Sequence, residues 1–355
     1  MVTTTTMKKN MLITTRYLFF MKNYKPLKFY RLLLAACCLL YITACNNDVN
    51  VSHIPVEIEM QRFDKELQAA AMDTALIPAL REKYQVFFEC YNMDIIEIGD
   101  SQSPYYASML QNFIQAEIVE MAYRKVEEIF PDEKELNAQL TDGFKHLKYY
   151  FPDMLIPKIY TYVSGFNTSL MLMEDAVAVG LDRYLSDTCS LYDQLNFPKY
   201  RQYNMRPERI PIECLQEWTG SEYLSDGGMN GNLLQEMIHE GKVSYVNTLC
   251  FPKAADTLLF GFTAKQMEWC KQNENYMWTH LLERQELYSN DQFLINKYIN
   301  YAPFTTAFSQ LSPGRACVWL GYRIVAAYMK KNKTSVPDMM LLDAQTLLKE
   351  SRYNP

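Results

Sequence analysis

Two residues with metal-binding chemistry, His239 and Glu240, lie side by side in the stretch LLQEMIHEGKVSYV, residues 233–246. In the zinc-peptidase motif H-E-x-x-H, two histidines four residues apart on a helix bind one metal ion, and the glutamate acts as a base toward metal-bound water. Position 243 is a valine, whose side chain has no atom that ligates zinc. Half of the motif is present, so a peptidase would need a further ligand that the sequence does not identify.

Glu236 adds a second pattern, because Glu236 and His239 form an E-x-x-H pair. Di-metal helical bundles use this spacing, but they need a second such pair and carboxylates from other helices. The chain has four histidines and no second E-x-x-H. We therefore predict no metal site and no cofactor. The alternatives for Glu236, His239 and Glu240 are ordinary structural positions or polar contacts inside a cleft.

A helix is predicted to carry these three residues, because apolar residues recur at helical spacing from residue 233 onward. At 100° per residue, His239 falls on the side opposite the apolar stripe, together with Glu236 and Val243. That side either lines a cleft or faces water. The stripe predicted to be buried consists of Leu234, Met237, Ile238, Gly241, Tyr245 and Thr248.

Arg315 is a further candidate cleft residue, in the stretch SPGRACVWLGYRIVAAY. Ser312 and Pro313 predict the cap and the first-turn proline of a helix that begins near Gly314. Arg315 either binds an acidic group together with free backbone N–H groups, or pairs with one of the protein's own acids. Close helix packing is predicted at the small residues Gly321, Ala326 and Ala327.

Residues 1–44 have the order of a secretion signal, since the basic stretch MKNYKPLKFYR runs into the apolar run LLLAACCLLYITA. The apolar run is too short to cross a bilayer as a helix, which needs about 20 residues. The tetrapeptide ITAC resembles a lipobox, in which Cys45 carries acyl chains such as palmitate; the alternative is an ordinary cleavage site with Cys45 as a bystander. Met21 is an alternative start that would exclude residues 1–20. We expect residues 45–55 to form a lipidated tether.

Net charge argues against several partners. Seven of the 35 Lys and Arg residues and none of the 41 Asp and Glu residues lie in residues 1–44, so the rest of the chain has a formal charge of −13. Such a chain is not attracted to nucleic acid or to an anionic lipid surface.

G-x-S-x-G, phosphate-loop and G-x-G-x-x-G motifs are absent from the sequence. Six cysteines follow Cys45 without a C-x-x-C, which indicates small buried side chains at least as well as disulfides.

The pattern of apolar residues predicts an α+β fold that is mainly helical. Residues 56–60 alternate between apolar and charged side chains and predict a strand. Residues 74–150 show helical spacing and predict several amphipathic helices. Residues 158–166 and 176–181 are rich in β-branched, aromatic and apolar side chains, and they predict two buried strands around a turn.

The C-terminal part is predicted to be helical from residue 233 onward, with a capping box that begins at Thr263 and a last helix over 338–350. We expect a small sheet with packed helices in an α+β subdomain at 56–250. A helical C-terminal subdomain is expected at 251–355.

Eight segments of the sequence, taken together, resemble the gliding-motility lipoproteins of the GldB family, found in Bacteroidetes. No single segment is specific alone, but their order and spacing extend over nearly the whole chain beyond Cys45. The segments are VEIEMQRFDKEL, FKHLKYYFPDMLIPKIYTYVSGF, VGLDRYLS, MIHEGKVSYV, FTAKQMEWCKQNENYMW, APFTTAFSQLSPGR, WLGYRIVAAYMKKN and KESRYNP.

The resemblance implies a protein of the bacterial cell envelope, held to a membrane by its N-terminal lipid, with its body in the periplasm or envelope. It implies contacts with other envelope proteins of the gliding machinery or an associated secretion apparatus, and it supplies no catalytic residues. The family also looks distantly similar to zincin-type peptidases, which implies a degenerate zincin-like scaffold; its members commonly have tyrosine where this chain has His239.

We therefore expect a non-catalytic scaffold or assembly component. One alternative is a zincin-like metal-dependent peptidase that uses His239 and Glu240. The other is a solute-binding lipoprotein, which the high aromatic content favours and which buried aromatic side chains would count against.

Overall fold

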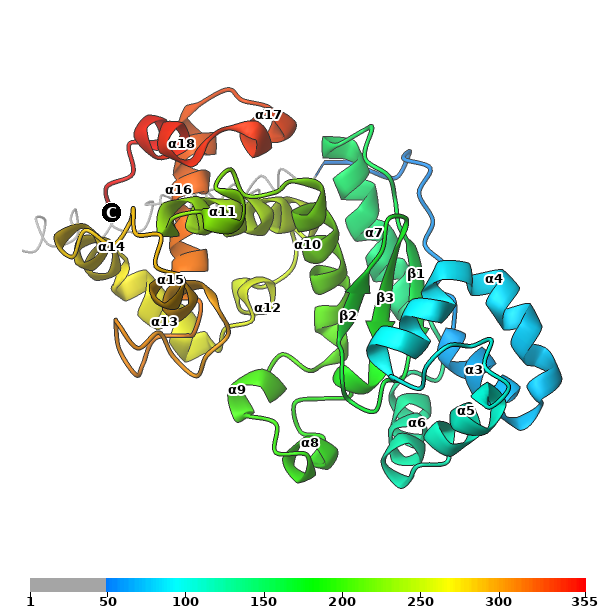
Figure 1. The fold of residues 1–355 in the computed structure, drawn as a ribbon. Helices are drawn as coiled ribbons and strands as arrows, with labels where there is room; N and C mark the ends of the chain where they lie inside the picture. Colours follow the sequence, from blue (N-terminus) through cyan, green and yellow to red (C-terminus); the bar gives the residue numbers. More distant parts are fainter. Residues whose placement is uncertain (1–48) are drawn as a thin grey trace, which may run out of the picture. The chain divides into compact units, whose positions relative to one another are not determined.

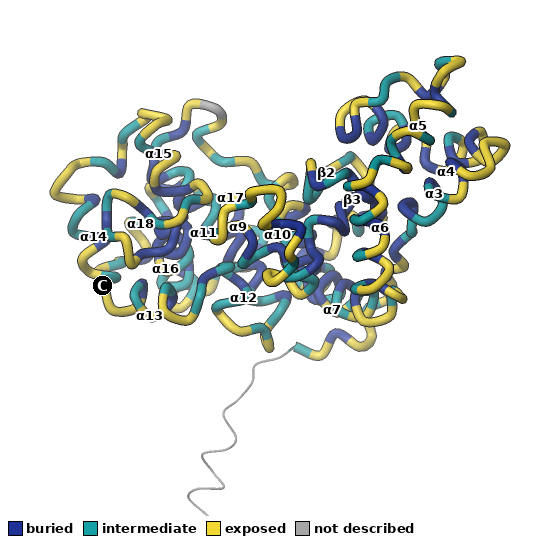
Figure 2. The backbone as a smooth tube through the Cα atoms, turned by 90° about the horizontal axis from the view of Figure 1, so that it is seen from below, coloured by how far each residue is buried: buried dark blue, intermediate teal, exposed yellow. Residues whose placement is uncertain are grey.

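The computed structural model describes residues 49–355, and within it residues 50–355 form one compact unit with a continuous hydrophobic core. The predicted signal peptide, the alternative start and the lipidation site Cys45 lie outside the described residues. In the described part of the chain, no helix has both the length and the apolar composition needed to cross a membrane. The element order and the distribution of buried residues are shown in Figures 1 and 2.

The first half of the body contains the helices predicted over 74–150, preceded by one more that starts at Phe63. Aromatic side chains form its core, because the Phe63 ring lies 4.9 Å from the rings of Tyr84 and Phe87 and 5.0 Å from that of Tyr91. All four rings are buried, and edge-on pairs of this kind stabilise a core beyond the area they bury. The helices are α3 (Phe63–Met72), α4 (Ile77–Cys90), α5 (Tyr106–Ile114), α6 (Glu117–Ile129) and α7 (Lys134–Tyr150).

The sheet has three strands in the order β1-β3-β2, with β1 (Lys158–Tyr162), β2 (Leu170–Leu172) and β3 (Ala176–Gly180). Both predicted strands exist, and they pair in parallel with Lys158 opposite Ala176. The short β2 lies between them in sequence and pairs antiparallel to β3. Every residue of β3 is buried, as expected for a continuous apolar run in the middle of a sheet.

The strand predicted over 56–60 is wrong. Its alternation is real, because Val56, Ile58 and Met60 are buried, but the backbone pairs with a helix instead of a sheet. The Ile58 N–H donates to Thr141 Oγ1 at 2.9 Å and the Met60 N–H to Asn137 Oδ1 at 3.1 Å, both on α7. A half-buried extended segment therefore has the sequence pattern of a strand without being one, and only Gln61 forms a bridge with β1, at Tyr160.

The second half of the body is helical, and the prediction of helices from residue 233 onward is confirmed. The capping box at Thr263 is confirmed, since its Oγ1 accepts the Gln266 N–H while the Gln266 side chain bonds the Thr263 N–H. The helix predicted over 338–350 is two helices instead of one. The helices are α8 (Ser190–Gln194), α9 (Lys199–Gln202), α10 (Ile210–Glu222), α11 (Leu233–Cys250), α12 (Asp256–Phe260), α13 (Ala264–Gln272), α14 (Glu274–Glu283), α15 (Gln292–Ile299), α16 (Ala316–Lys331), α17 (Val336–Leu341) and α18 (Ala344–Ser351).

Helix α16 begins two residues later than predicted, and Ser312 is not its cap. Arg315 precedes the first turn with a left-handed backbone, φ 60°. The first N–H, that of Ala316, donates to Thr305 Oγ1 at 3.2 Å, and the same hydroxyl donates to the Pro313 carbonyl oxygen. A distant threonine therefore satisfies the orphan donor of the helix, which local sequence cannot indicate.

Helices α11 and α16 cross at two glycines. A Cβ added to Gly321 would overlap the Met237 carbonyl oxygen and lie 2.6 Å from its carbon, and one added to Gly241 would lie 2.6 Å from the Gly321 carbonyl oxygen. The predicted close packing at Gly321 is confirmed, because no side chain fits at this crossing. The predicted mainly helical α+β class is also confirmed, and the predicted division at 250/251 stays a prediction.

Candidate functional site

Helix α11 positions three of the four candidate residues. It starts in a capping box, in which Asn232 Oδ1 accepts the Gln235 N–H at 3.1 Å and Gln235 Oε1 accepts the Asn232 N–H at 2.9 Å. Burial is not confined to the predicted stripe. Val243, on the opposite side, is only 3% exposed, so this face of α11 is covered by protein at that point.

The three candidates on α11 do not converge on one point. Glu236 Oε1 accepts a hydrogen bond from Ser225 Oγ at 2.9 Å. Glu240 Oε2 pairs with Arg315 Nη2 at 2.7 Å. His239 is half-buried, and no hydrogen bond to its ring occurs within residues 49–355. In the same residues, no three His, Cys, Asp or Glu side chains are arranged to hold a metal ion.

Arg315 takes the second of the two predicted roles, pairing with an acid of the protein. Besides Glu240, its Nε donates to the Ile299 carbonyl oxygen at 3.0 Å, and its guanidinium lies 4.4 Å from the centre of the Tyr301 ring. Burial by itself would lower the pKa of Arg315. The nearby Tyr301 and Glu240 raise it by more, so the pKa of Arg315 is raised overall. Arg315 is therefore a fixed cation that neutralises Glu240.

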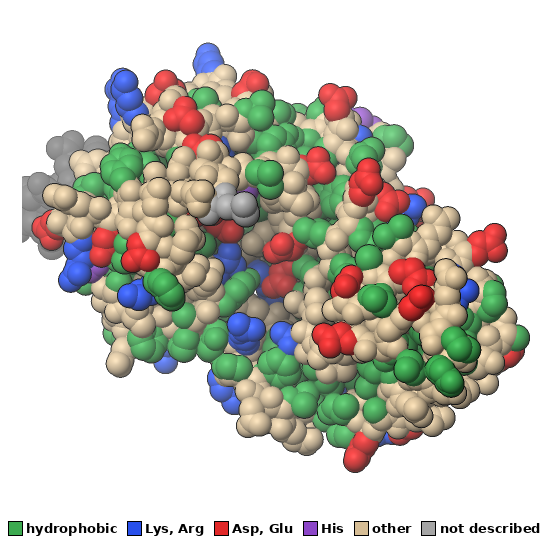
Figure 3. All heavy atoms as spheres, viewed as in Figure 1, with side chains coloured by type: hydrophobic (Ala, Val, Ile, Leu, Met, Phe, Trp, Pro, Cys, Tyr) green, Lys and Arg blue, Asp and Glu red, His purple; other side chains and the backbone are tan. Residues whose placement is uncertain are grey.

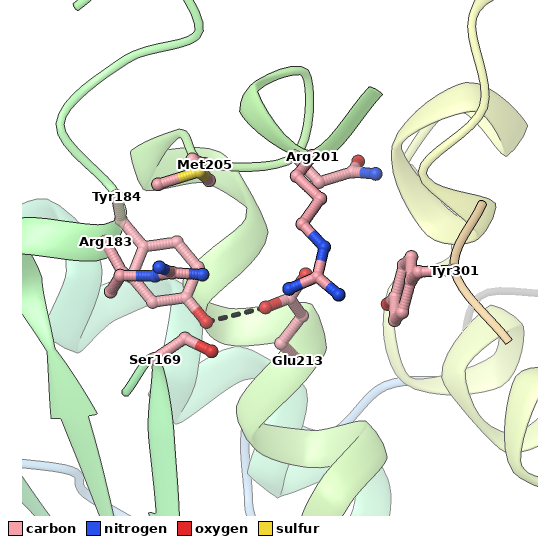
Figure 4. Close-up of a pocket in the computed structure, with 8 residues that line it drawn as sticks. Ser169, Arg183, Tyr184, Arg201, Met205, Glu213 and Tyr301 are labelled. Carbon is pink, nitrogen blue, oxygen red and sulfur yellow. Dashed lines mark hydrogen bonds between the residues drawn. The ribbon is translucent and has the colours of Figure 1, made fainter. Parts of the chain in front are cut away.

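A pocket opens beside this pair and shares Tyr301 with it. We call it the arginine pocket; its volume is about 190 Å³. The space-filling view shows a hollow on this face, with acidic and basic side chains gathered around it (Figure 3). In Figure 4, Arg201 extends from α9 toward Glu213 and Tyr301, while Arg183 and Tyr184 enter from the sheet side. The lining residues are Ser169, Arg183, Tyr184, Arg201, Asn204, Met205, Glu213 and Tyr301.

The only acid in the lining, Glu213, is already satisfied. Tyr184 donates its hydroxyl hydrogen to Glu213 Oε2 at 2.6 Å. Arg209 donates from Nε and Nη2 to Oε1 at 3.0 and 2.8 Å. Because Arg209 is itself buried, these two charge-assisted hydrogen bonds to Oε1 neutralise the carboxylate inside the protein.

The two lining arginines lack such a partner. Within residues 49–355, neither Arg183 nor Arg201 forms an ion pair with a carboxylate. Arg183 donates from Nη1 to the Phe166 carbonyl oxygen at 2.9 Å and stacks over Phe197, 4.5 Å from the ring centre. Burial lowers the pKa of Arg183, and the nearby positive charge of Arg201 lowers it further, against an opposing effect of Asp182.

Asp182 adjoins Arg183 but is directed into the fold. Its Oδ2 accepts the N–H groups of Ser164 and Phe166 at 3.0 and 2.6 Å, and its side chain is fully buried. Burial raises the pKa of Asp182 to about 6, with the two N–H groups acting in the opposite direction. Asp182 therefore holds the loop after β1 and leaves the Arg183 guanidinium available to the pocket.

One further acid links the pocket to the Glu240–Arg315 pair. Glu217 lies one helical turn after Glu213 on α10. Although its side chain reaches solvent, partial burial raises its pKa, as do the charges of Glu240 and Glu213. The arginine pocket and the Glu240–Arg315 pair together form one charged cleft. Its basic and acidic groups come from α9, α10, α11 and the segment after α15.

These features define a mainly helical α+β protein. Its charged cleft lies beside helix α11, which carries the first half of a zinc-peptidase motif. The sequence model of the family described as "Gliding motility protein GldB" matches residues 44–355. The chain belongs to this family, as the resemblance of its eight segments implied. Neither a curated protein nor a solved structure matches the chain.

Sequence reasoning missed the arginine pocket. Its residues come from four elements that no local spacing connects. A signal was nevertheless present, because the segment VGLDRYLS, which carries part of the family resemblance, contains Arg183 and Tyr184.

Proposed function

We propose that this protein is a lipid-anchored, non-catalytic scaffold or assembly component of the gliding machinery or an associated secretion apparatus. Membership of the gliding motility family supports the motility role and a place in the cell envelope. The lipid on Cys45 would attach the body to a membrane, and the body would act by contact with other envelope proteins.

The observation that carries the non-catalytic role is the environment of Glu240. A metallopeptidase base must be free to take a proton from metal-bound water. Here the Glu240 carboxylate is bonded to Arg315 at 2.7 Å, with the two side chains 25% and 14% exposed. The guanidinium occupies the carboxylate that a catalytic base would need free, which favours a structural role.

The position of the missing second histidine supports the same reading. Val243 is buried against α10, where a Cβ added to Gly220 would lie 3.8 Å from Val243 Cγ2. A metal ligand at this point would have no open volume in front of it. The helix is therefore best explained as a degenerate zincin-like element whose metal-facing side has become a packing surface.

The aromatic side chains weigh against the solute-binding alternative. Of the twelve largest fully buried side chains in residues 49–355, eleven are Trp, Tyr or Phe rings, among them Trp218, Tyr91 and Tyr106, and the twelfth is Arg209. Their number in the sequence thus reflects the core rather than an exposed stacking platform.

Glu240→Gln and Arg315→Gln form a matched pair that separates catalysis from contact. Each loses the same half-buried ion pair, at a cost of about 1–2 kcal/mol, but only the first removes the candidate base. In a gliding bacterium that lacks its own family member, we expect the wild-type chain and both variants to restore colony spreading to similar extents. Immunoblots of the envelope fraction would confirm equal protein levels.

Two results would contradict this account. Loss of spreading in Glu240→Gln alone, at wild-type protein level, would indicate a catalytic base. Failure of the wild-type chain to restore spreading would contradict the motility role itself.

A further inference from the structure

The arginine pocket combines two features that together call for a ligand. The chain beyond residue 44 carries 13 more acids than bases, yet Arg183 and Arg201 converge on one cavity without an ion-pair partner in residues 49–355. Like charges held close together repel. The repulsion between the two guanidinium groups destabilises the folded protein, and a bound anion would remove this destabilisation.

The geometry of the pocket suits a flat anionic group. A guanidinium presents a rigid, planar fork of N–H donors that matches the two oxygens of a carboxylate. Arg183 is partly fixed by Phe166 and by the Phe197 ring, so little side-chain freedom is lost when it binds. Arg201 is exposed, and its side chain forms no hydrogen bond within residues 49–355, so it can close over the bound group.

The presence of Glu213 selects between anions. Its carboxylate lies in the lining and forms an ion pair with Arg209 at 2.8 Å. A second negative group must approach this charge, which penalises a phosphate dianion more than a carboxylate monoanion. The volume of about 190 Å³ exceeds that of a cavity known to hold one benzene molecule, so one side-chain-sized group fits.

We propose that the arginine pocket binds a carboxylate group of a partner protein, with Arg183 and Arg201 as its ligands and Tyr301 beside it. The choice of a protein as the source rests on the proposed contact function; the choice of a carboxylate rests on the pocket alone. The pocket receives the end of an acidic side chain while the partner's backbone stays outside.

The test is an NMR titration of residues 46–355, which contain the compact unit, following the arginine Nε–H signals. The probes are N-acetylglutamate N-methylamide, its glutamine analogue, succinate and inorganic phosphate. We expect the glutamate probe to bind with a Kd on the order of 1 mM and the glutamine analogue not to bind. Arg201→Gln should weaken glutamate binding about tenfold or more.

Arg284→Gln is the matched control, because it removes one exposed arginine charge outside the pocket and should leave the Kd within about twofold. Four outcomes would overturn the proposal: no binding of either carboxylate probe, equal binding of the glutamine analogue, tighter binding of phosphate, or equal weakening by both variants. Binding of succinate without the glutamate probe would overturn the protein source. None of these readouts depends on colony spreading, so failure here is distinguishable from failure of the proposed function.

Discussion

Replacing Gly321 with alanine should destabilise the body by more than about 3 kcal/mol, because an added methyl group meets backbone rather than a movable side chain. At this crossing a Cβ would overlap the carbonyl oxygen of Met237 and lie 2.6 Å from its carbon. Helix α16 would have to move away from α11, and the buried apolar contacts along both helices would open. Urea denaturation of residues 46–355, followed by circular dichroism, measures the effect.

Gly220→Ala is the control for this experiment. Gly220 lies inside α10, and its added Cβ would meet only Val243 Cγ2, at 3.8 Å, an ordinary contact distance. Alanine is favoured over glycine inside a helix by about 0.5–1 kcal/mol, so this variant should be as stable as the wild type or slightly more stable. Similar stability of the two glycine variants would show that α11 and α16 are not in contact as described.

Replacing Arg209 with methionine should cost about 3–5 kcal/mol, the range for breaking a buried ion pair by removing one partner. Arg209 is 1% exposed. Its loss would leave Glu213 without its ion-pair partner, and the carbonyl oxygens of Leu258 and Leu259, which it also bonds, without a donor. The junction between α10 and α12, on one side of the arginine pocket, should loosen first.

Arg201→Met provides the comparison for Arg209→Met, since it makes the same chemical change at an exposed residue. We expect a change within about 0.5 kcal/mol in the same urea denaturation experiment, as for most surface substitutions. A large loss of stability in Arg201→Met would mean that this residue serves the fold and not a ligand. A small loss in Arg209→Met would contradict the buried pair with Glu213.

Much of the fold was predictable because its signals are local. The strands at 158–162 and 176–180 are continuous apolar or β-branched runs, and the Thr263 capping box needs only four consecutive residues. The errors arose where a distant partner decides the structure. Side chains of α7 take the backbone hydrogen bonds of residues 56–60, and Thr305 replaces Ser312 at the start of α16.

The candidate site was harder to predict for the same reason. The spacing of Glu236, His239 and Glu240 drew attention to α11, but spacing cannot show that Glu240 would meet Arg315, 75 residues further along. It also cannot show that Arg183 and Arg201 line one pocket, because the two residues lie on separate elements that meet only in the folded chain. Charge pairing across a fold is a tertiary property.

The most direct test of the account is the zinc content of purified residues 46–355, prepared without a histidine tag and measured by elemental analysis beside a His239→Ala variant. The account predicts no stoichiometric zinc in either protein, because Glu240 is paired with Arg315 and position 243 is a buried valine. About one equivalent of zinc in the wild type, lost in His239→Ala, would contradict it and make α11 the metal helix of a peptidase.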